Sequence, residues 1–148
     1  MSTYQIRHRV GIKASPNAVY KALTDTDRLS KWWTSDTRGT SEVGKPLEFW
    51  FGTFCQELEV TALEPQELVR WKGTEKGIDE WVGTEITFRL KPDDKQIHVH
   101  FTHSNWGADT DFLGHCSTKW AVFLLSLKDL LETGKGRPAP DSWPIDHG

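Results

Sequence analysis

Hydrophobic and polar residues alternate in several short stretches of the chain, a pattern typical of β-strands with one buried face. In the first stretch, residues 4–13, one face collects Tyr4, Ile6, His8, Val10 and Ile12. Further alternating stretches cover residues 46–51, 56–62, 68–72, 81–92 and 97–103. Because turn-forming residues separate most of these stretches, the pattern predicts an antiparallel sheet of about six strands.

Two short helical segments are predicted directly after the first strand. Ser15 suits the N-cap of the first, and Pro16 suits its first helical position, where the missing N–H has no cost. Residues 25–33 predict a second brief helix that ends at Trp32 and Trp33. The polar, glycine-containing residues 34–46 are expected to form a loop.

Residues 112–131 predict one long amphipathic helix, about 30 Å long at 1.5 Å per residue. At 100° per residue, one arc about 120° wide holds only apolar side chains. They are Phe112, Leu113, Cys116, Trp120, Phe123, Leu124, Leu127, Leu130 and Leu131. Asp109 or Asp111 is expected to cap the start of this helix, and Gly134 its end.

The order of these elements is one strand, two short helices, a run of antiparallel strands and a long C-terminal helix. This order predicts an α+β fold, in which a twisted sheet wraps around the long helix. Residues 1–148 are expected to form a single domain. Residues 135–148, which contain three prolines, are expected to form an extended C-terminal tail on the surface.

The histidines of residues 97–103 raise the question of a metal site. His98 and His100 share the polar face of this strand, and His103 lies on the apolar face. No third ligand accompanies the first two, so we predict a solvated sheet face and no metal.

His103 and His8 each interrupt an inward apolar row. Each either hydrogen-bonds a backbone carbonyl or a tryptophan, or acts as a polar anchor for a ligand.

Large aromatic side chains dominate the predicted inward faces. They either fill the core completely or leave a cavity between sheet and helix, because wide rigid rings pack less perfectly than aliphatic chains. If a cavity is present, the lining is predicted to comprise Trp33, Phe49, Phe51, Trp71, Phe88, Phe101, His103, Phe112, Cys116 and Trp120. The apolar surroundings of Cys116 favour an inert thiol over a nucleophile.

Composition narrows the classes of partner. The chain has 18 Lys and Arg against 21 Asp and Glu, a net charge of −3, which excludes the broad basic surface needed to bind nucleic acid or an anionic membrane. Its longest apolar run, "AVFLL", is far shorter than a membrane span, and its start lacks an apolar signal core. We therefore expect a cytoplasmic protein. No nucleotide fingerprint is visible, so no cofactor is predicted.

Several motifs occur in the order found in a known superfamily: "IKASPNAVYKALTD", "KWW", "VTALEPQELVRWK", "WVGTEITFRL", "VHFTHSNW" and "CSTKWAVFLLSLKDLLETGKG". The chain resembles the START-like or SRPBCC superfamily, which has the helix-grip fold. Within it, the chain is similar to homologues of the activator of the heat-shock protein 90 ATPase. The resemblance implies that the first strand pairs with the last and that the concave sheet grips the long helix.

Three functions remain open at this stage. The leading hypothesis is a binding protein that holds a small hydrophobic or aromatic ligand between the sheet and the C-terminal helix. The second is a co-chaperone-like regulator with a chaperone or homodimer contact, for which Ala121, Val122 and Leu125 on the outer side of the helix are candidates. The third is a cyclase or dehydratase that uses a cavity histidine, although no catalytic residue can be assigned.

Overall fold

The computed structural model describes residues 3–146. In chain order the elements are β1 (Tyr4–Ile12), α1 (Pro16–Thr24), α2 (Thr26–Leu29), β2 (Asp36–Gly39), β3 (Pro46–Phe51), β4 (Phe54–Glu64), β5 (Leu68–Gly73), the 3₁₀ helix η1 (Asp79–Trp81), β6 (Glu85–Pro92), β7 (Ile97–Trp106) and α3 (Asp111–Thr133). Ser15 caps α1 through a hydrogen bond from the Ala18 N–H, and Pro16 occupies the first turn, as predicted.

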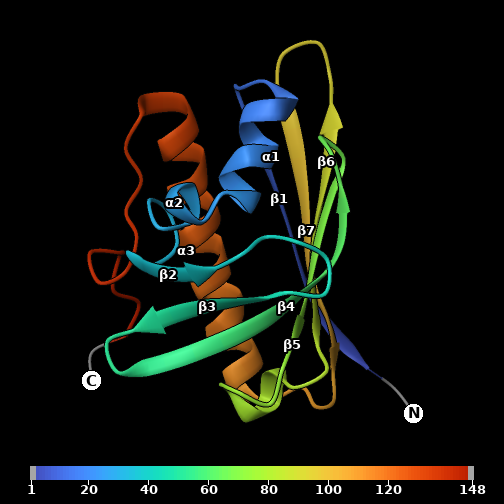
Figure 1. Ribbon diagram of the computed structural model, residues 1–148, viewed down its shortest axis with the longest axis vertical. Coiled ribbons are helices and arrows are strands. Elements are labelled where there is room, and N and C mark those ends of the chain that lie inside the picture. Colours follow the sequence, from blue (N-terminus) through green and yellow to red (C-terminus); the bar gives the residue numbers. More distant parts are fainter. Residues whose placement is uncertain (1–2, 147–148) are drawn as a thin grey trace.

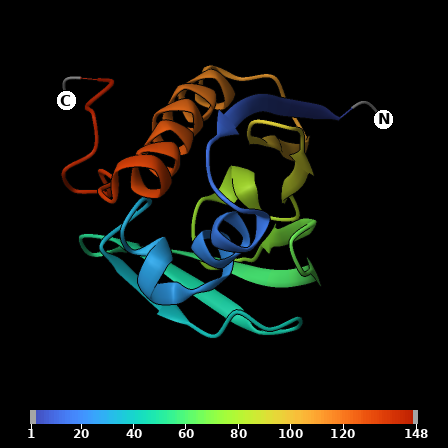
Figure 2. The same ribbon diagram turned by 90° about the horizontal axis from the view of Figure 1, so that it is seen from above.

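The strands form one antiparallel sheet in the order β1-β7-β6-β5-β4-β3-β2. Pairing of β1 with β7 confirms what the resemblance implied, because it brings the first strand beside the last. Figure 1 shows α3 lying lengthwise against this sheet, and Figure 2 shows α1 and α2 between α3 and the strands β2 to β4. The helix-grip fold is therefore confirmed.

The inward faces follow the predicted alternation closely on β7. Ile97, Val99, Phe101 and His103 are buried, whereas His98 and His100 are only half-buried. Neighbouring strands add inward residues of the same kind, such as Val69 and Trp71 on β5 and Ile86 and Phe88 on β6. The core between sheet and helix is therefore largely aromatic.

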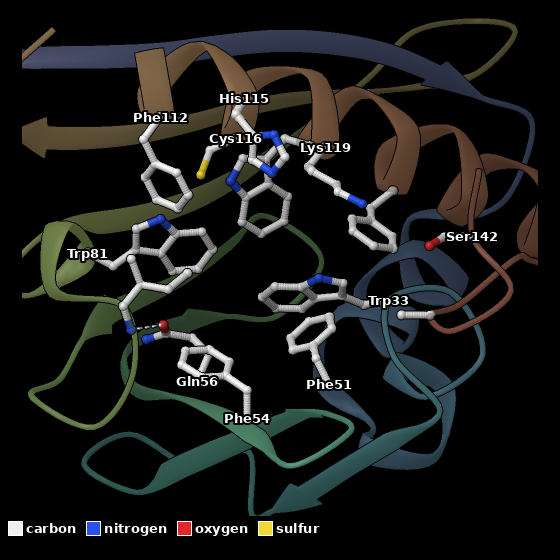
Figure 3. Close-up of a pocket in the computed structure, with 14 residues that line it drawn as sticks. Trp33, Phe51, Phe54, Gln56, Trp81, Phe112, His115, Cys116, Lys119 and Ser142 are labelled. Carbon is white, nitrogen blue, oxygen red and sulfur yellow. Dashed lines mark hydrogen bonds between the residues drawn. The ribbon is translucent and has the colours of Figure 1, made fainter. Parts of the chain in front are cut away.

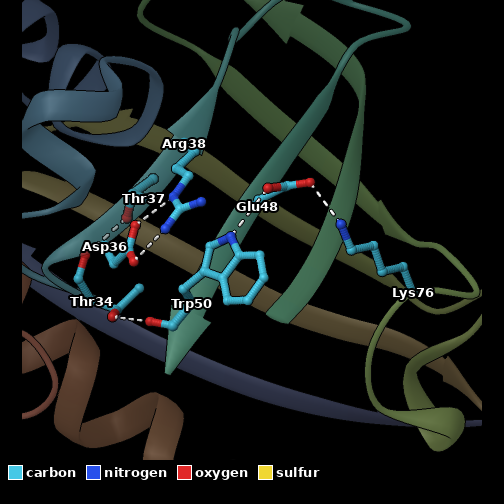
Figure 4. A network of polar contacts seen from close by, with 7 residues as sticks. All are labelled: Thr34, Asp36, Thr37, Arg38, Glu48, Trp50 and Lys76. Atoms are coloured by element: carbon cyan, nitrogen blue, oxygen red, sulfur yellow. Dashed lines mark hydrogen bonds and ion pairs between the residues drawn. The ribbon is translucent and has the colours of Figure 1, made fainter. Parts of the chain in front are cut away.

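The sheet has seven strands, one more than predicted, because β2 lies within residues 34–46, which were expected to be a loop. This polar edge strand has no apolar alternation, and its stability comes from pairing with β3 and from polar contacts (Figure 4). Arg38 donates to both Asp36 carboxylate oxygens, at 2.8 and 2.9 Å, and its guanidinium lies 4.8 Å from the centre of the Trp50 ring. On the other side of Trp50, Lys76 pairs with Glu48 at 2.8 Å.

Helix α3 matches the predicted amphipathic helix to within two residues at either end. Its buried side chains include Cys116, Trp120, Phe123, Leu124 and Leu127 from the apolar arc, and also the polar Ser126. The predicted cap was wrong: the Thr110 hydroxyl accepts the Leu113 N–H, so neither Asp109 nor Asp111 is the N-cap. Gly134 ends the helix with φ = 88°, as expected for a left-handed C-terminal residue.

Within the described residues, no helix combines the length and hydrophobicity needed to cross a membrane.

The segment after α3 is attached to the domain rather than lying freely on its surface. The buried Ser126 hydroxyl accepts the Arg137 N–H at 2.7 Å and donates to the Trp32 carbonyl at 2.8 Å. Ala139 then exchanges backbone hydrogen bonds with Trp33 and Ser35. Apart from the single bridge between Ala139 and Thr34, this segment has no regular secondary structure, and its backbone groups pair with the turn after α2.

Candidate functional site

A cavity of about 250 Å³ lies between α3, the start of β4, the 3₁₀ helix η1 and the C-terminal segment (Figure 3). Its walls are mostly aromatic and aliphatic, with a few polar groups. The lining residues are Trp33, Phe51, Phe54, Gln56, Ile78, Trp81, Phe112, His115, Cys116, Lys119, Trp120, Phe123, Ala139 and Ser142. The core is therefore not filled solid, and the space is at the edge of the aromatic cluster rather than at its centre.

Trp120, on the inward face of α3, connects the rings of the cavity wall. Its ring centre lies 4.9 Å from that of Trp33 and 6.0 Å from that of Trp81, with the Trp81 ring nearly parallel at 17°. Trp33 in turn lies 6.2 Å from Phe51 and at 64° to it. Such contacts between rigid rings hold the wall in shape without a ligand, because each ring is restrained by its neighbours.

Polar contacts hold the two rims of the cavity. On one rim, the Gln56 side chain accepts the Ile78 N–H at 2.8 Å and donates to the Glu57 carbonyl at 3.0 Å, which joins β4 to the segment before η1. On the other rim, His115 of α3 pairs with Asp146 at 2.7 Å. The C-terminal segment therefore forms part of the mouth, which the sequence did not indicate.

His103 lies behind the cavity wall and is fully buried. Its Nδ1 accepts the Trp120 indole N–H at 3.1 Å, and its Nε2 lies 2.8 Å from the Thr84 hydroxyl. The Thr84 hydroxyl donates its only proton to the Trp81 carbonyl at 2.6 Å, so Nε2 of His103 must carry a proton and donate. Burial lowers the pKa of His103 to about 3. The imidazole is therefore neutral, and it orients two of the tryptophan-bearing segments of the wall.

His8 does not reach the cavity. Its Nε2 lies 3.0 Å from the Ser117 carbonyl oxygen and 3.2 Å from the Ser117 hydroxyl, so it donates from β1 to α3. For both inward histidines, the sequence left open either a structural hydrogen bond or a role as polar anchor for a ligand. The contacts of His8 and His103 correspond to structural hydrogen bonds.

The predicted lining residues divide into two layers. The cavity wall contains Trp33, Phe51, Phe112, Cys116 and Trp120. A second layer, packed behind the wall and away from the cavity, contains Phe49, Trp71, Phe88, Phe101 and His103. Alternation along a strand distinguishes inward from outward side chains, but it does not indicate how deep an inward side chain lies in the core. The sequence therefore did not distinguish the cavity wall from the layer behind it.

Four of the nine wall residues missing from the prediction, Ile78, Trp81, Ala139 and Ser142, lie outside the long helix and the strands. Trp81 was placed in a strand, but it belongs to η1, and β6 begins only at Glu85. Val82, which follows Trp81 and lies before the start of β6, is 44% exposed. Gly83 after this turn, with φ = 78°, was a usable signal that the strand begins later. Phe123 was among the inward apolar positions predicted for the helix, although not among the predicted lining, and Lys119 was recognisable only as a neighbour of Trp120.

Cys116 is the nucleophilic side chain on the cavity wall. Burial raises the pKa of its thiol to about 11, and the nearby Trp81 indole offsets this only slightly. The thiol is therefore protonated and a poor nucleophile at neutral pH. Cys116 is therefore not an activated nucleophile.

The outward histidines of β7 do not come together with further ligands. His98 pairs with the turn residue Asp93 at 2.6 Å, and the two imidazole centres of His98 and His100 are 6.5 Å apart. Among residues 3–146, no group of three or more His, Cys, Asp or Glu side chains is arranged to hold a metal ion.

Comparison with known proteins places these features in context. The family described as activator of Hsp90 ATPase homolog 1-like protein matches residues 13–132. The solution structure of the Aha1 dimer from Colwellia psychrerythraea is similar, with 51% sequence identity and a TM-score of 0.84 over 90% of this chain and 99% of that chain. No curated protein matches the sequence.

More distant structures share the fold alone. Protein MLL2253 from Mesorhizobium loti is 20% identical, with a TM-score of 0.76 over 87% of this chain and 97% of that chain. Protein BH1534 from Bacillus halodurans is 17% identical, with a TM-score of 0.73 over 89% of this chain and 100% of that chain.

Proposed function

The chain belongs to the activator of Hsp90 ATPase homolog 1-like family, and from this premise we propose that it binds a small, largely apolar ligand in the cavity between the sheet and α3. The observation that carries the proposal is the cavity itself, whose wall includes the rings of Trp33, Trp81, Phe112 and Trp120. Apolar, concave and pre-formed walls with a few polar groups are characteristic of small-molecule sites.

The volume limits the size of the ligand. Sites for drug-sized molecules usually enclose about 300 to 1,000 Å³, and this cavity, at about 250 Å³, is just below that range. A ligand with one or two fused rings fits this volume. Stacking on Trp33 or Trp120 would then replace the ring contacts that a packed core would have provided.

Binding of the neutral probe 2-naphthylmethanol tests the proposal. A bound ring next to Trp33, Trp81 and Trp120 should change tryptophan fluorescence in a saturable titration. Cys116→Leu, which adds bulk to the wall, should weaken binding at least about threefold and leave stability unchanged or higher, because the added atoms enter open space. Cys55→Leu is the matched control, since Cys55 lies on β4 opposite Trp50 and away from the cavity. Equal binding by both variants, or binding of neither this alcohol nor its carboxylate analogue 2-naphthoate by wild type, would contradict the proposal.

Catalysis by a cavity histidine has less support than binding. Both ring nitrogens of His103 are engaged by Trp120 and Thr84, and the ring lies behind the wall. His115 is on the rim but paired with Asp146. A general acid or base must reach the substrate through a free nitrogen. His103 offers none, and His115, whose Nδ1 pairs with Asp146, could act only through Nε2, beside a protonated Cys116 thiol that is a poor nucleophile.

Self-association is a second candidate, because the Colwellia relative has been solved as a dimer. On the outer side of α3, Leu125 is 54% exposed, next to the half-buried Ala121 and Val122. We propose a second copy of this chain as the partner for this face, in the manner of a regulatory interaction protein. Leu125→Lys should shift a dimer to monomer in sedimentation equilibrium, whereas Leu125→Met should not. A monomeric wild type would exclude this candidate.

A cytoplasmic location is part of the proposal. It is supported by the two buried cysteines, Cys55 and Cys116, which are both free thiols. Fractionation of host cells, with the protein followed by antibody, tests this location.

A further inference from the structure

We propose that the ligand of this cavity is an anion, a small aromatic carboxylate whose charged end pairs with the Lys119 ammonium at the mouth. This inference rests on the proposed binding function and specifies the class of ligand. Among the polar groups that face the cavity, the Lys119 ammonium is a cation without an ion-pair partner in the described residues, and the Trp33 and Trp81 indoles are further donors.

Lys119 is the one lysine or arginine on the cavity wall. Figure 3 shows its side chain extending from α3 toward the space above Trp33. Among residues 3–146, its ammonium forms no ion pair, although the same helix pairs Lys128 with Glu132 at 3.1 Å. Lys119 is half-buried as a residue, and an ammonium beside an apolar space, with no protein carboxylate paired to it, attracts an anionic ligand group.

Two acidic side chains near the cavity are engaged elsewhere. Asp146 pairs with His115 at 2.7 Å. Glu80, which precedes Trp81 in η1, accepts the Thr110 hydroxyl at 3.0 Å. Within residues 3–146 no carboxylate pairs with Lys119, so a ligand carboxylate would not compete with an existing ion pair of this ammonium.

Two indole N–H groups on the wall add further donors. The Trp81 side chain is 6% exposed, and its buried Nε1 has no acceptor other than the neighbouring Cys116 thiol, which is a weak one. Trp33 is 3% exposed, and its indole N–H is not among the fully buried groups without a partner. A buried donor with only a weak acceptor is costly, and a ligand oxygen would reduce that cost for Trp81.

Not every unpartnered indole indicates a ligand. The Nε1 atoms of Trp71 and Trp106 also lack partners, but neither residue lines the cavity. Both pack in edge-to-face contacts, Trp71 with Phe88 at 69° and Trp106 with His103 at 60°. Edge-to-face packing can turn an N–H toward a ring, which is a weak acceptor. The inference therefore rests on Lys119, and the wall indoles add to it.

Isothermal titration with two probes of nearly equal shape tests the inference. The probes are 2-naphthoate, which carries a carboxylate, and the neutral 2-naphthylmethanol. The measured quantity is the ratio of their dissociation constants in wild type, in Lys119→Met, which keeps the length of the side chain without its charge, and in Lys119→Glu. Lys21→Met, on the exposed face of α1 and outside the cavity, controls for the change in net charge.

We expect the preference for 2-naphthoate to fall about tenfold in Lys119→Met and further in Lys119→Glu, whereas Lys21→Met behaves as wild type. Affinity for the alcohol should change little in Lys119→Met, because the apolar wall remains. An unchanged ratio in Lys119→Met, with the alcohol still bound, would overturn this inference and leave the proposed function standing. Absence of binding of both probes to wild type would overturn both.

Discussion

Replacing His103 with asparagine is expected to make the fold less sensitive to acid. The wild-type imidazole is buried, neutral and hydrogen-bonded to Trp120 and Thr84, and its pKa is lowered from 6.5 to about 3. Between these two pH values the unfolded chain binds a proton at this position and the folded chain does not. The contribution of the neutral imidazole is therefore complete above the unfolded pKa and is lost as the pH falls from 6.5 toward 3.

The size of the effect follows from the two pKa values. Between pH 7 and pH 4, proton binding by the unfolded state alone lowers the free energy of unfolding by on the order of 3 kcal/mol. Exposed carboxylates also lose stabilising contacts as the pH falls, because their partners lower their pKa values. Examples are Asp36 beside Arg38, Glu48 beside Lys76, and Glu132 beside the Lys13 N–H. The effect of His103 must therefore be measured as a difference between variants.

Urea unfolding at pH 7 and pH 4, followed by tryptophan fluorescence, gives this difference. His103→Asn cannot take up the proton but keeps an acceptor close to the position of Nδ1, so its loss of stability between the two pH values should be smaller than that of wild type by about 3 kcal/mol. His103→Leu should show the same reduced pH dependence but a further cost of about 1 to 3 kcal/mol at pH 7, because the Trp120 N–H loses its acceptor.

His100→Asn is the matched control for this comparison. It removes a histidine from the same strand, but from the half-buried outer face, where burial and then Lys91 and Arg9 lower the pKa. We expect a much smaller change in the pH dependence. If His103→Asn loses as much stability as wild type between pH 7 and pH 4, the assignment of a neutral, buried imidazole is wrong.

Three further predictions concern the attachment of α3 and the segment after it, each measured by urea unfolding at pH 7. Thr110→Ala should lower the free energy of unfolding by about 1 kcal/mol, because Thr110 caps α3, and Asp109→Ala should change it little. A larger loss of stability in Asp109→Ala than in Thr110→Ala would instead identify Asp109 as the cap, as the sequence predicted. Ser126→Ala should cost about 1 to 3 kcal/mol, since its hydroxyl joins α3 to the Trp32 carbonyl and to the C-terminal segment. Gly134→Ala should cost about 1 kcal/mol because of the positive φ, and an unchanged stability would contradict the left-handed end of α3.

Periodicity alone gave a sound account of the secondary structure wherever a segment has one buried face. The nine apolar positions of α3 and the alternation of β7 were identified because burial on one side forces a helical or a twofold period. The same argument failed for β2, whose polar edge position imposes no apolar period, and for Trp81, which lies in a single 3₁₀ turn. Segments without a buried period therefore have to be located from their tertiary contacts.

The sequence also did not predict how deep each inward side chain lies in the core. Phe51 and Phe49 share the inward face of β3, yet Phe51 reaches the cavity and Phe49 lies behind the wall. The difference comes from the curvature of the sheet and the position of Trp33, which packs 4.2 Å from Phe49 between their ring centres. Curvature is a property of all the strands together, so no local pattern encodes it.

The sequence by itself determined the order of the elements, the side of each strand and helix that is buried, and the aromatic character of the interior, because each of these depends on residues close together in the chain. Only the tertiary structure decided that a cavity remains, that Lys119 and the segment around Ala139 and Ser142 border it, and that His103 supports its wall from behind. These features arise where α3, η1 and the C-terminal segment meet. Contacts between residues far apart in the chain leave no periodic signal, and they depend on how the curved sheet and the helix fail to fill the space between them.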